Sequence, residues 1–286
     1  MKMKLSLLIG ITLGVSYSAW IHASEFQSPR VAALGGAGRA SPLSTDAIYL
    51  NPSYIPQIPL HVISLNYLNY KGISGDYYAP KGYILNAAFQ DGTRGSYFQA
   101  GLGYTRLTNG SMFHLGVAAE INANWSVGVS AKLLQPRFQF MNQVVNGSLS
   151  MTWVLSKMVR AAVIADNLFK SGLDQGLLRE VTLAMKFGFG PDLSLFIDPH
   201  WYPDLGSYPE TFGGEFGIEY FVTDIICLRA GGFKNSKPNF QSQRRDGAAV
   251  GIGFVLPRTA IDYSYSRVLG SQKLGDAHNV ALSLYF

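Results

Sequence analysis

The chain has 286 residues, of which 48% are hydrophobic and 14% are charged, with 31 glycines and a formal net charge of +5. A charged fraction so far below the ~25% of soluble domains disfavours a soluble enzyme, and because the basic residues form no stripe, we predict no nucleic-acid partner. The single cysteine, Cys227, excludes an intrachain disulfide framework and a cysteine-based metal site.

The chain begins with the pattern of a secretory signal peptide, which we place at residues 1–23. Lys2 and Lys4 precede a short apolar run, and Ile21-His22-Ala23 is a candidate cleavage site. A membrane anchor is the alternative, but the run is shorter than the ~20 residues of a spanning helix. The sequence therefore predicts that the protein leaves the cytoplasm.

Residues 24–59 contain a stretch that joins no strand pattern, LGGAGRASPLSTDAIYLNPS. A short helix through Leu50 is predicted within it, because Ser44 or Thr45 can cap its start and Pro52 ends it. Three glycines before this helix permit tight turns with positive φ: Gly35, Gly36 and Gly38.

From residue 60 onward, apolar and polar residues alternate with the period of β-strands. Most of these segments are near the ~9–11 residues that a tilted strand needs to cross a bilayer. The fourteen segments are residues 60–69, 81–90, 95–106, 111–121, 124–134, 147–155, 159–168, 179–189, 193–201, 213–223, 226–234, 246–256, 259–268 and 277–286. We therefore predict an all-β fold for residues 60–286, a transmembrane antiparallel up-and-down β-barrel of about 14 strands.

The connections between these segments alternate in length. Those after even-numbered segments are short: 91–94, 122–123, 156–158, 190–192, 224–225 and 257–258. Those after odd-numbered segments are long, except 107–110: 70–80, 135–146, 169–178, 202–212, 235–245 and 269–276. Such sorting is typical of bacterial outer-membrane barrels, with short periplasmic turns and long outer loops. The predicted location is the outer membrane of a Gram-negative type cell, with both termini in the periplasm.

Aromatic residues support a barrel in contact with outer-membrane lipid. Six of them lie beside the short turns on the apolar face, where an interfacial girdle is expected: Phe89, Trp125, Phe187, Tyr220, Phe254 and Phe286. The amphipathic last strand ending in Phe286 resembles the signal that bacterial barrels present to the barrel-assembly machinery. An ordinary last strand is the alternative.

A barrel of fourteen strands is intermediate in width between small barrels, whose lumen is filled by side chains, and large barrels, whose lumen is a water channel. The inward positions here are mostly Gly, Ala and Ser, so wall side chains would leave the lumen open. We therefore predict that residues 24–59 fold into the lumen as a plug. A disordered periplasmic tail is the alternative, which the low charge of the segment disfavours.

Three short motifs in this segment carry a family resemblance: Gly38-Arg39-Ala40, Asp46-Ala47 and Asn51-Pro52. The chain resembles the FadL-like long-chain fatty acid transporters and the PorV-like barrels of type IX secretion, although Ser53 stands where those families have Ala. The resemblance implies a fourteen-stranded barrel with an N-terminal hatch. It also implies passage of hydrophobic molecules by movement of the hatch and through a side opening in the wall.

Charged residues at inward positions form a second group of candidate site residues. By alternation, ten of them face the lumen: Glu120, Lys132, Arg160, Asp166, Glu180, Lys186, Glu215, Glu219, Arg229 and Asp262. A tight turn near Asp224 would place Glu219 opposite Arg229 as a cross-strand pair. The charges either hold the wall and seat the plug, which we favour, or select a ligand headgroup or gate the hatch.

No arrangement of catalytic residues is recognisable in the sequence. The histidines have no serine in a hydrolase pattern beside them, and GGAGRA lacks the strand, helix and lysine of a phosphate loop. Asp198, His200 and Asp204 are possible metal ligands, but an aromatic and proline-rich loop edge explains them as well. We predict no catalytic site, no metal and no cofactor.

Three functions remain open at this point. The first is a plugged channel for hydrophobic or amphipathic small molecules such as fatty acids. The second is a non-transport barrel that acts as a PorV-like scaffold or secretion accessory in an outer-membrane complex. The third is a small polar porin, which the charged lumen favours and the plug disfavours.

Overall fold

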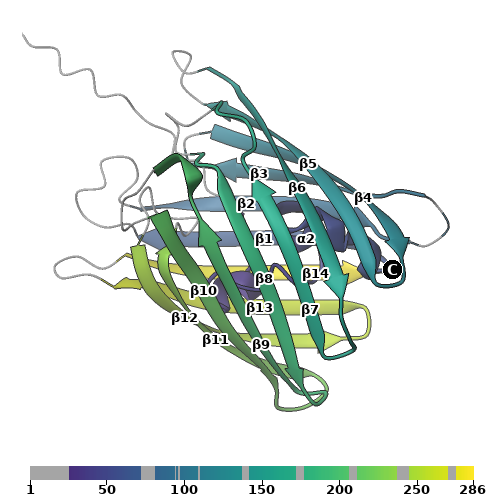
Figure 1. The fold of residues 1–286 in the computed structure, drawn as a ribbon. Helices are drawn as coiled ribbons and strands as arrows, with labels where there is room; N and C mark the ends of the chain where they lie inside the picture. The colour runs from purple at the N-terminus through teal and green to yellow at the C-terminus, as the bar shows by residue number, and fades with distance from the viewer. Residues whose placement is uncertain are drawn as a thin grey trace, which may run out of the picture.

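The computed structural model describes residues 26–71, 81–93, 95, 97–108, 110–136, 142–171, 177–205, 211–236, 245–269 and 275–286. Within these ranges, fourteen antiparallel strands form a closed barrel (Figure 1). Each strand pairs with its neighbours in sequence, and β1 closes the circle against β14. The predicted up-and-down barrel is therefore confirmed. The predicted signal peptide, residues 1–23, lies outside the described residues.

The strands and their bounds are β1 (His61–Lys71), β2 (Lys81–Asp91), β3 (Gln99–Leu107), β4 (Gly110–Asn122), β5 (Trp125–Pro136), β6 (Val144–Val154), β7 (Val159–Asp166), β8 (Glu180–Phe189), β9 (Leu193–Trp201), β10 (Phe212–Phe221), β11 (Ile226–Ser236), β12 (Arg245–Leu256), β13 (Thr259–Leu269) and β14 (Asp276–Tyr285). Alternate residues of β1 are buried inside the barrel and exposed outside it, as the period-2 sequence pattern requires. Closure satisfies the backbone groups that an open sheet would leave at its edges.

The beginning of β3 differs from the sequence prediction. We expected this strand to begin at residue 95, but β3 begins at Gln99. The amide of Gly92 still donates to the carbonyl of Leu60, next to the β1 strand, but Gly95 adopts a φ of 127°, which is incompatible with an extended strand. Tyr97 and Phe98 are consequently exposed in the connection rather than paired in the wall.

Residues 26–59, called the N-terminal segment below, form three short helices inside the barrel: α1 (Pro29–Ala33), α2 (Asp46–Leu50) and η1 (Pro52–Gln57). Figure 1 shows them as purple coils enclosed by the strands. Helix α1 contacts β11 to β14, whereas α2 and η1 contact the opposite wall around β3 to β6. No helix in the described part of the chain has the length and apolarity needed to span a membrane.

The predicted cap of α2 is wrong in its chemistry. Thr45 occupies the N-cap position but its side chain makes no capping hydrogen bond. Ser44 instead adopts a φ of 54°, and its hydroxyl hydrogen-bonds Ser64 and Ser283 on the barrel wall. The Ser44 hydroxyl therefore binds the wall, although the local sequence pattern predicted that it would cap the helix. As predicted, α2 ends before Pro52.

Candidate functional site: the interface between the N-terminal segment and the barrel wall

The small inward residues of the wall lie where the backbone of the N-terminal segment touches it. A Cβ added to Gly231 would lie 2.1 Å from the carbonyl carbon of Leu34, and one added to Gly128 would lie 2.2 Å from the amide nitrogen of Ser53. Gly35 has a φ of 70°, and its own added Cβ would meet the backbone of Gly232 at 2.6 Å. Glycines on both sides of the interface thus permit backbone-to-backbone packing that any larger side chain would prevent.

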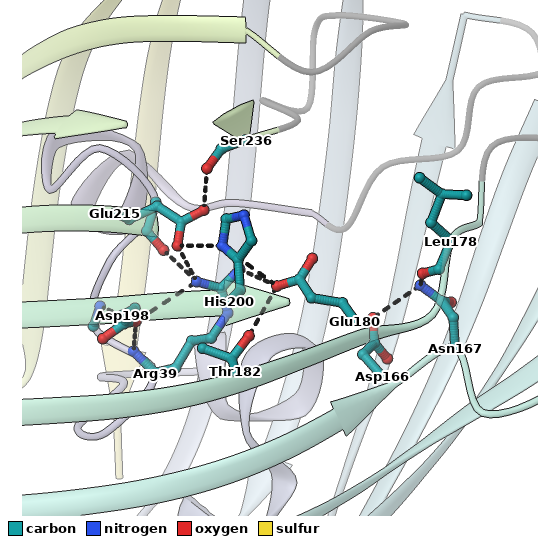
Figure 2. Close-up of polar contacts among 12 residues, drawn as sticks. Arg39, Asp166, Asn167, Leu178, Glu180, Thr182, Asp198, His200, Glu215 and Ser236 are labelled. Carbon is teal, nitrogen blue, oxygen red and sulfur yellow. Dashed lines mark hydrogen bonds and ion pairs between the residues drawn. The ribbon is translucent and has the colours of Figure 1, made fainter. Parts of the chain in front are cut away.

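Arg39 is clamped by carboxylates from three adjacent wall strands (Figure 2). The backbone amides of Gly38 and Arg39 each donate to Asp198 Oδ2 on β9 at 2.9 Å. The Arg39 guanidinium lies 3.0 Å from Glu215 on β10 and 3.3 Å from Glu180 on β8. Gly38 has a φ of 115°, so the tight turn predicted there is what aims these two amides at one carboxylate oxygen.

Further polar residues hold these carboxylates in place. Nδ1 of His200 hydrogen-bonds Glu215 at 3.2 Å, and the Ser236 hydroxyl donates to the other oxygen of Glu215 at 2.6 Å. The Thr182 hydroxyl donates to Glu180 at 2.9 Å. Such partners are what buried carboxylates need when they are removed from water.

The charge of Arg39 is strongly favoured in this environment. Burial lowers the pKa of its guanidinium, but the facing carboxylates, led by Glu215, outweigh burial and raise that pKa above its ordinary value. Arg39 is therefore a permanent cation whose removal would leave several buried carboxylates without their counter-charge.

Arg30 forms a second ionic contact, which the sequence analysis missed. Its guanidinium makes a bidentate pair with Glu219 at 2.8 and 3.1 Å and stacks over Phe196 with 5.2 Å to the ring centroid. Arg229 donates to the same carboxylate at 2.8 Å, so the predicted Glu219–Arg229 cross-strand pair is confirmed. Arg229 also pairs with Asp262 on β13. The available signal was composition, because Arg30 and Arg39 are the only basic residues between 24 and 59.

Asp46, a residue of the family motif, is buried close enough to Arg30 to interact with its charge. It accepts a hydrogen bond from the Ser28 hydroxyl at 2.9 Å, and Ser28 also caps α1 by accepting from the amide of Val31. Burial raises the pKa of Asp46 to about 7, although the positive charge of Arg30 opposes this shift. Asp46 therefore ties α2 to the start of α1.

Asn51 and Ser53 attach the segment to β6. The Asn51 amide donates to the carbonyl of Arg39 at 2.7 Å and to the Thr152 hydroxyl at 2.9 Å. The backbone amide of Ser53 donates to Ser150 at 2.9 Å, and its hydroxyl donates to Asn51 at 2.6 Å. Pro52 between them begins η1, where its missing amide costs no hydrogen bond.

The other predicted charged residues occupy different surroundings. Arg160 hydrogen-bonds Ser41 and Tyr54 of the N-terminal segment. Lys132 forms an ion pair of 2.8 Å with Asp166, another residue of the wall. Lys186 lies 5.7 Å from the centroid of the Phe196 ring. Glu120 lies near the end of β4 and is exposed. Four of the predicted residues therefore contact the N-terminal segment directly: Arg160, Glu180, Glu215 and Glu219. Arg229 contacts Glu219, and Asp262 contacts Arg229.

The three possible metal ligands point to different partners. Asp198 holds two backbone amides and His200 contacts Glu215, as described above, whereas Asp204 pairs with Arg179 outside the lumenal network. In the described ranges, no three His, Cys, Asp or Glu side chains are grouped as metal ligands would be. Asp198 and His200 lie on β9, where they contact the N-terminal segment and Glu215.

The barrel is similar to several solved structures. It matches the CymD monoaromatic hydrocarbon channel with a TM-score of 0.66 and 12% identity, over 93% of this chain and 98% of CymD. It matches the P. putida toluene transporter TodX with a TM-score of 0.67 and 10% identity, over 93% and 99% of the two chains. For a Pseudomonas aeruginosa FadL homologue the TM-score is 0.60 and the identity 13%, over 92% and 99%.

No protein-family model matches the sequence, and no curated protein matches it. The similarity to the solved structures therefore lies in the fold, which agrees with the FadL-like barrel expected from the three short motifs. The chain spans almost the full length of each of these structures.

Proposed function

We propose that this protein is an outer-membrane channel for hydrophobic small molecules, in which the N-terminal segment is a plug that closes the lumen. The observation that carries the proposal is the attachment of this segment inside the barrel, where Arg30 and Arg39 pair with buried wall carboxylates. Two of the similar structures are named for monoaromatic hydrocarbons and toluene, which supports an apolar ligand. The proposal includes no catalytic step.

The plug suits an apolar ligand better than a polar one. Leu34, Ile48 and Ile55 of the segment are fully buried against the wall, so an apolar molecule can replace some of these contacts as the segment shifts. The ionic contacts define the closed position, since separating buried partners without replacement is costly. Passage then follows from a small displacement of the segment rather than from its expulsion.

We propose that the side opening lies at the predicted periplasmic rim of the wall, beside the connection between β2 and β3. Pairing of these strands stops at Asp91 and Ala100, and the exposed Tyr97 and Phe98 lie in the connection. Gly92 of this connection touches η1, because a Cβ there would lie 1.9 Å from the carbonyl oxygen of Ile58. A shift of the plug would therefore change the contacts of this part of the wall directly.

The test is uptake by whole bacterial cells that lack their own hydrocarbon channels. Cells with the wild-type protein should take up radiolabelled toluene faster than cells without it, and should stay resistant to polar antibiotics. The double variant Arg30→Gln/Arg39→Gln should admit the antibiotics, whereas Lys157→Gln, in an exposed turn, should behave as wild type. Uptake equal to that of empty cells would refute the channel, and antibiotic entry through the wild type would favour a polar porin.

A further inference from the structure

The short connection between β3 and β4 leaves a notch in the rim of the barrel. Pairing between β1 and β2 continues to Lys71 and Lys81, but pairing between β2 and β3 ends four residues lower, at Leu85 and Arg106. The β3–β4 hairpin closes there, and β5 ends level with it on the other side, with Pro136 opposite Gly110. A cavity of about 620 Å³ occupies this position, between the raised end of β2, the hairpin and the end of β5.

The notch is lined by cations on the outer face of the wall. Lys81 and Arg106 line the cavity and are exposed, and Lys71 lies directly opposite Lys81 in the strand pairing. Like charges opposite each other in a sheet are unfavourable without a counter-ion. Lys71 also lies opposite Asp276 of β14, whereas no carboxylate among the described residues forms an ion pair with Lys81 or Arg106.

Aromatic residues lie below these cations on the same outer face. Tyr83 and Tyr104 line the notch and are 44% and 40% exposed, and Tyr104 packs against Phe113 at 4.9 Å between ring centroids. On the inner side, a hydrogen bond of 2.8 Å between Tyr70 and Thr108 joins β1 to the hairpin. The notch therefore presents cations toward the rim and aromatic surface toward the middle of the wall.

We propose that the notch binds the phosphorylated headgroup of a lipid from the outer leaflet of the membrane. Phosphate oxygens accept from Lys81 and Arg106, while the acyl chains lie on Tyr83, Tyr104 and Phe113. Tyrosines at the boundary between headgroups and acyl chains are typical of membrane interfaces. The inference depends on the proposed function for one point only, the orientation in which the long connections face the exterior of the cell.

The test measures binding of bisphosphorylated lipid A to the purified full chain in mild detergent by native mass spectrometry. Wild type should retain one lipid A, and Lys81→Gln/Arg106→Gln should bind it about tenfold more weakly, since two charge-assisted contacts are lost. The matched control is Lys234→Gln, an exposed lysine near the same rim on β11, which should bind as wild type. Lipid A without its phosphates should also bind about tenfold more weakly.

Several results would overturn the proposal. Equal weakening in Lys234→Gln would indicate general attraction to a basic rim, and unchanged binding in the double variant would place the lipid elsewhere. Displacement of lipid A by inorganic phosphate would indicate a free-anion site, and displacement by sodium oleate a carboxylate site. Toluene uptake should be unchanged in Lys81→Gln/Arg106→Gln, so failure of the notch and failure of the channel are distinguishable.

Discussion

The contact between Arg30 and Glu219 gives the sharpest test of how the N-terminal segment is held. Arg30→Gln removes a bidentate pair of 2.8 and 3.1 Å in which both side chains are about 5% exposed. Breaking a buried pair typically costs ~3–5 kcal/mol. Because Arg229 still donates to Glu219, we expect the lower end, about 3 kcal/mol of unfolding free energy for Arg30→Gln, and a similar loss for Glu219→Gln.

The double variant distinguishes a direct contact from two independent losses. The coupling free energy of Arg30→Gln with Glu219→Gln should reach ~1.5–3 kcal/mol, within the range found for residues in one network. The assay is guanidinium unfolding in lipid vesicles, followed by the fluorescence of the barrel tryptophans. Arg179→Gln breaks a part-exposed pair with Asp204 and should change little. Additivity within ~0.5 kcal/mol would refute the direct contact and the ionic seating of the segment with it.

Three further predictions follow from the same interface. Gly231→Ala should destabilise the protein by ~1–3 kcal/mol because its Cβ would collide with the segment, whereas Gly232→Ala, whose Cβ meets only a backbone oxygen at 3.5 Å, should be milder; equal unfolding midpoints would contradict the close packing. Asp198→Ala should speed hydrogen exchange of the two amides that this carboxylate holds, and unchanged exchange rates would show that they are protected otherwise. The pKa of Asp46 is raised from 3.8 to about 7, so the folded state binds the extra proton and the wild type should lose stability relative to Asp46→Asn as pH rises from 4 to 7, by at most ~1.4 kcal/mol per pH unit; parallel stability curves would contradict the shift.

The sequence alone determined the features that depend on neighbours in the chain. Alternation of side chains has a period of two residues in any strand, so the strand number and the inward faces followed from local pattern. The positive φ values of Gly35, Gly36 and Gly38 and the pairing of Glu219 with Arg229 across a tight turn were predictable for the same reason. The motif residues Asp46 and Asn51 came from resemblance.

Only the tertiary structure decided which part of the wall meets the N-terminal segment. Arg30 and Glu219 are 189 residues apart, and Arg39 is 159 residues from Asp198. No local pattern encodes such a contact, because it depends on how the segment is oriented within a closed barrel. The same packing directs the Ser44 hydroxyl to Ser64 on the wall, so that it does not cap the helix. A hydrogen-bond partner on the wall can replace the one that the local sequence favours, because a buried hydroxyl needs only one well-placed partner.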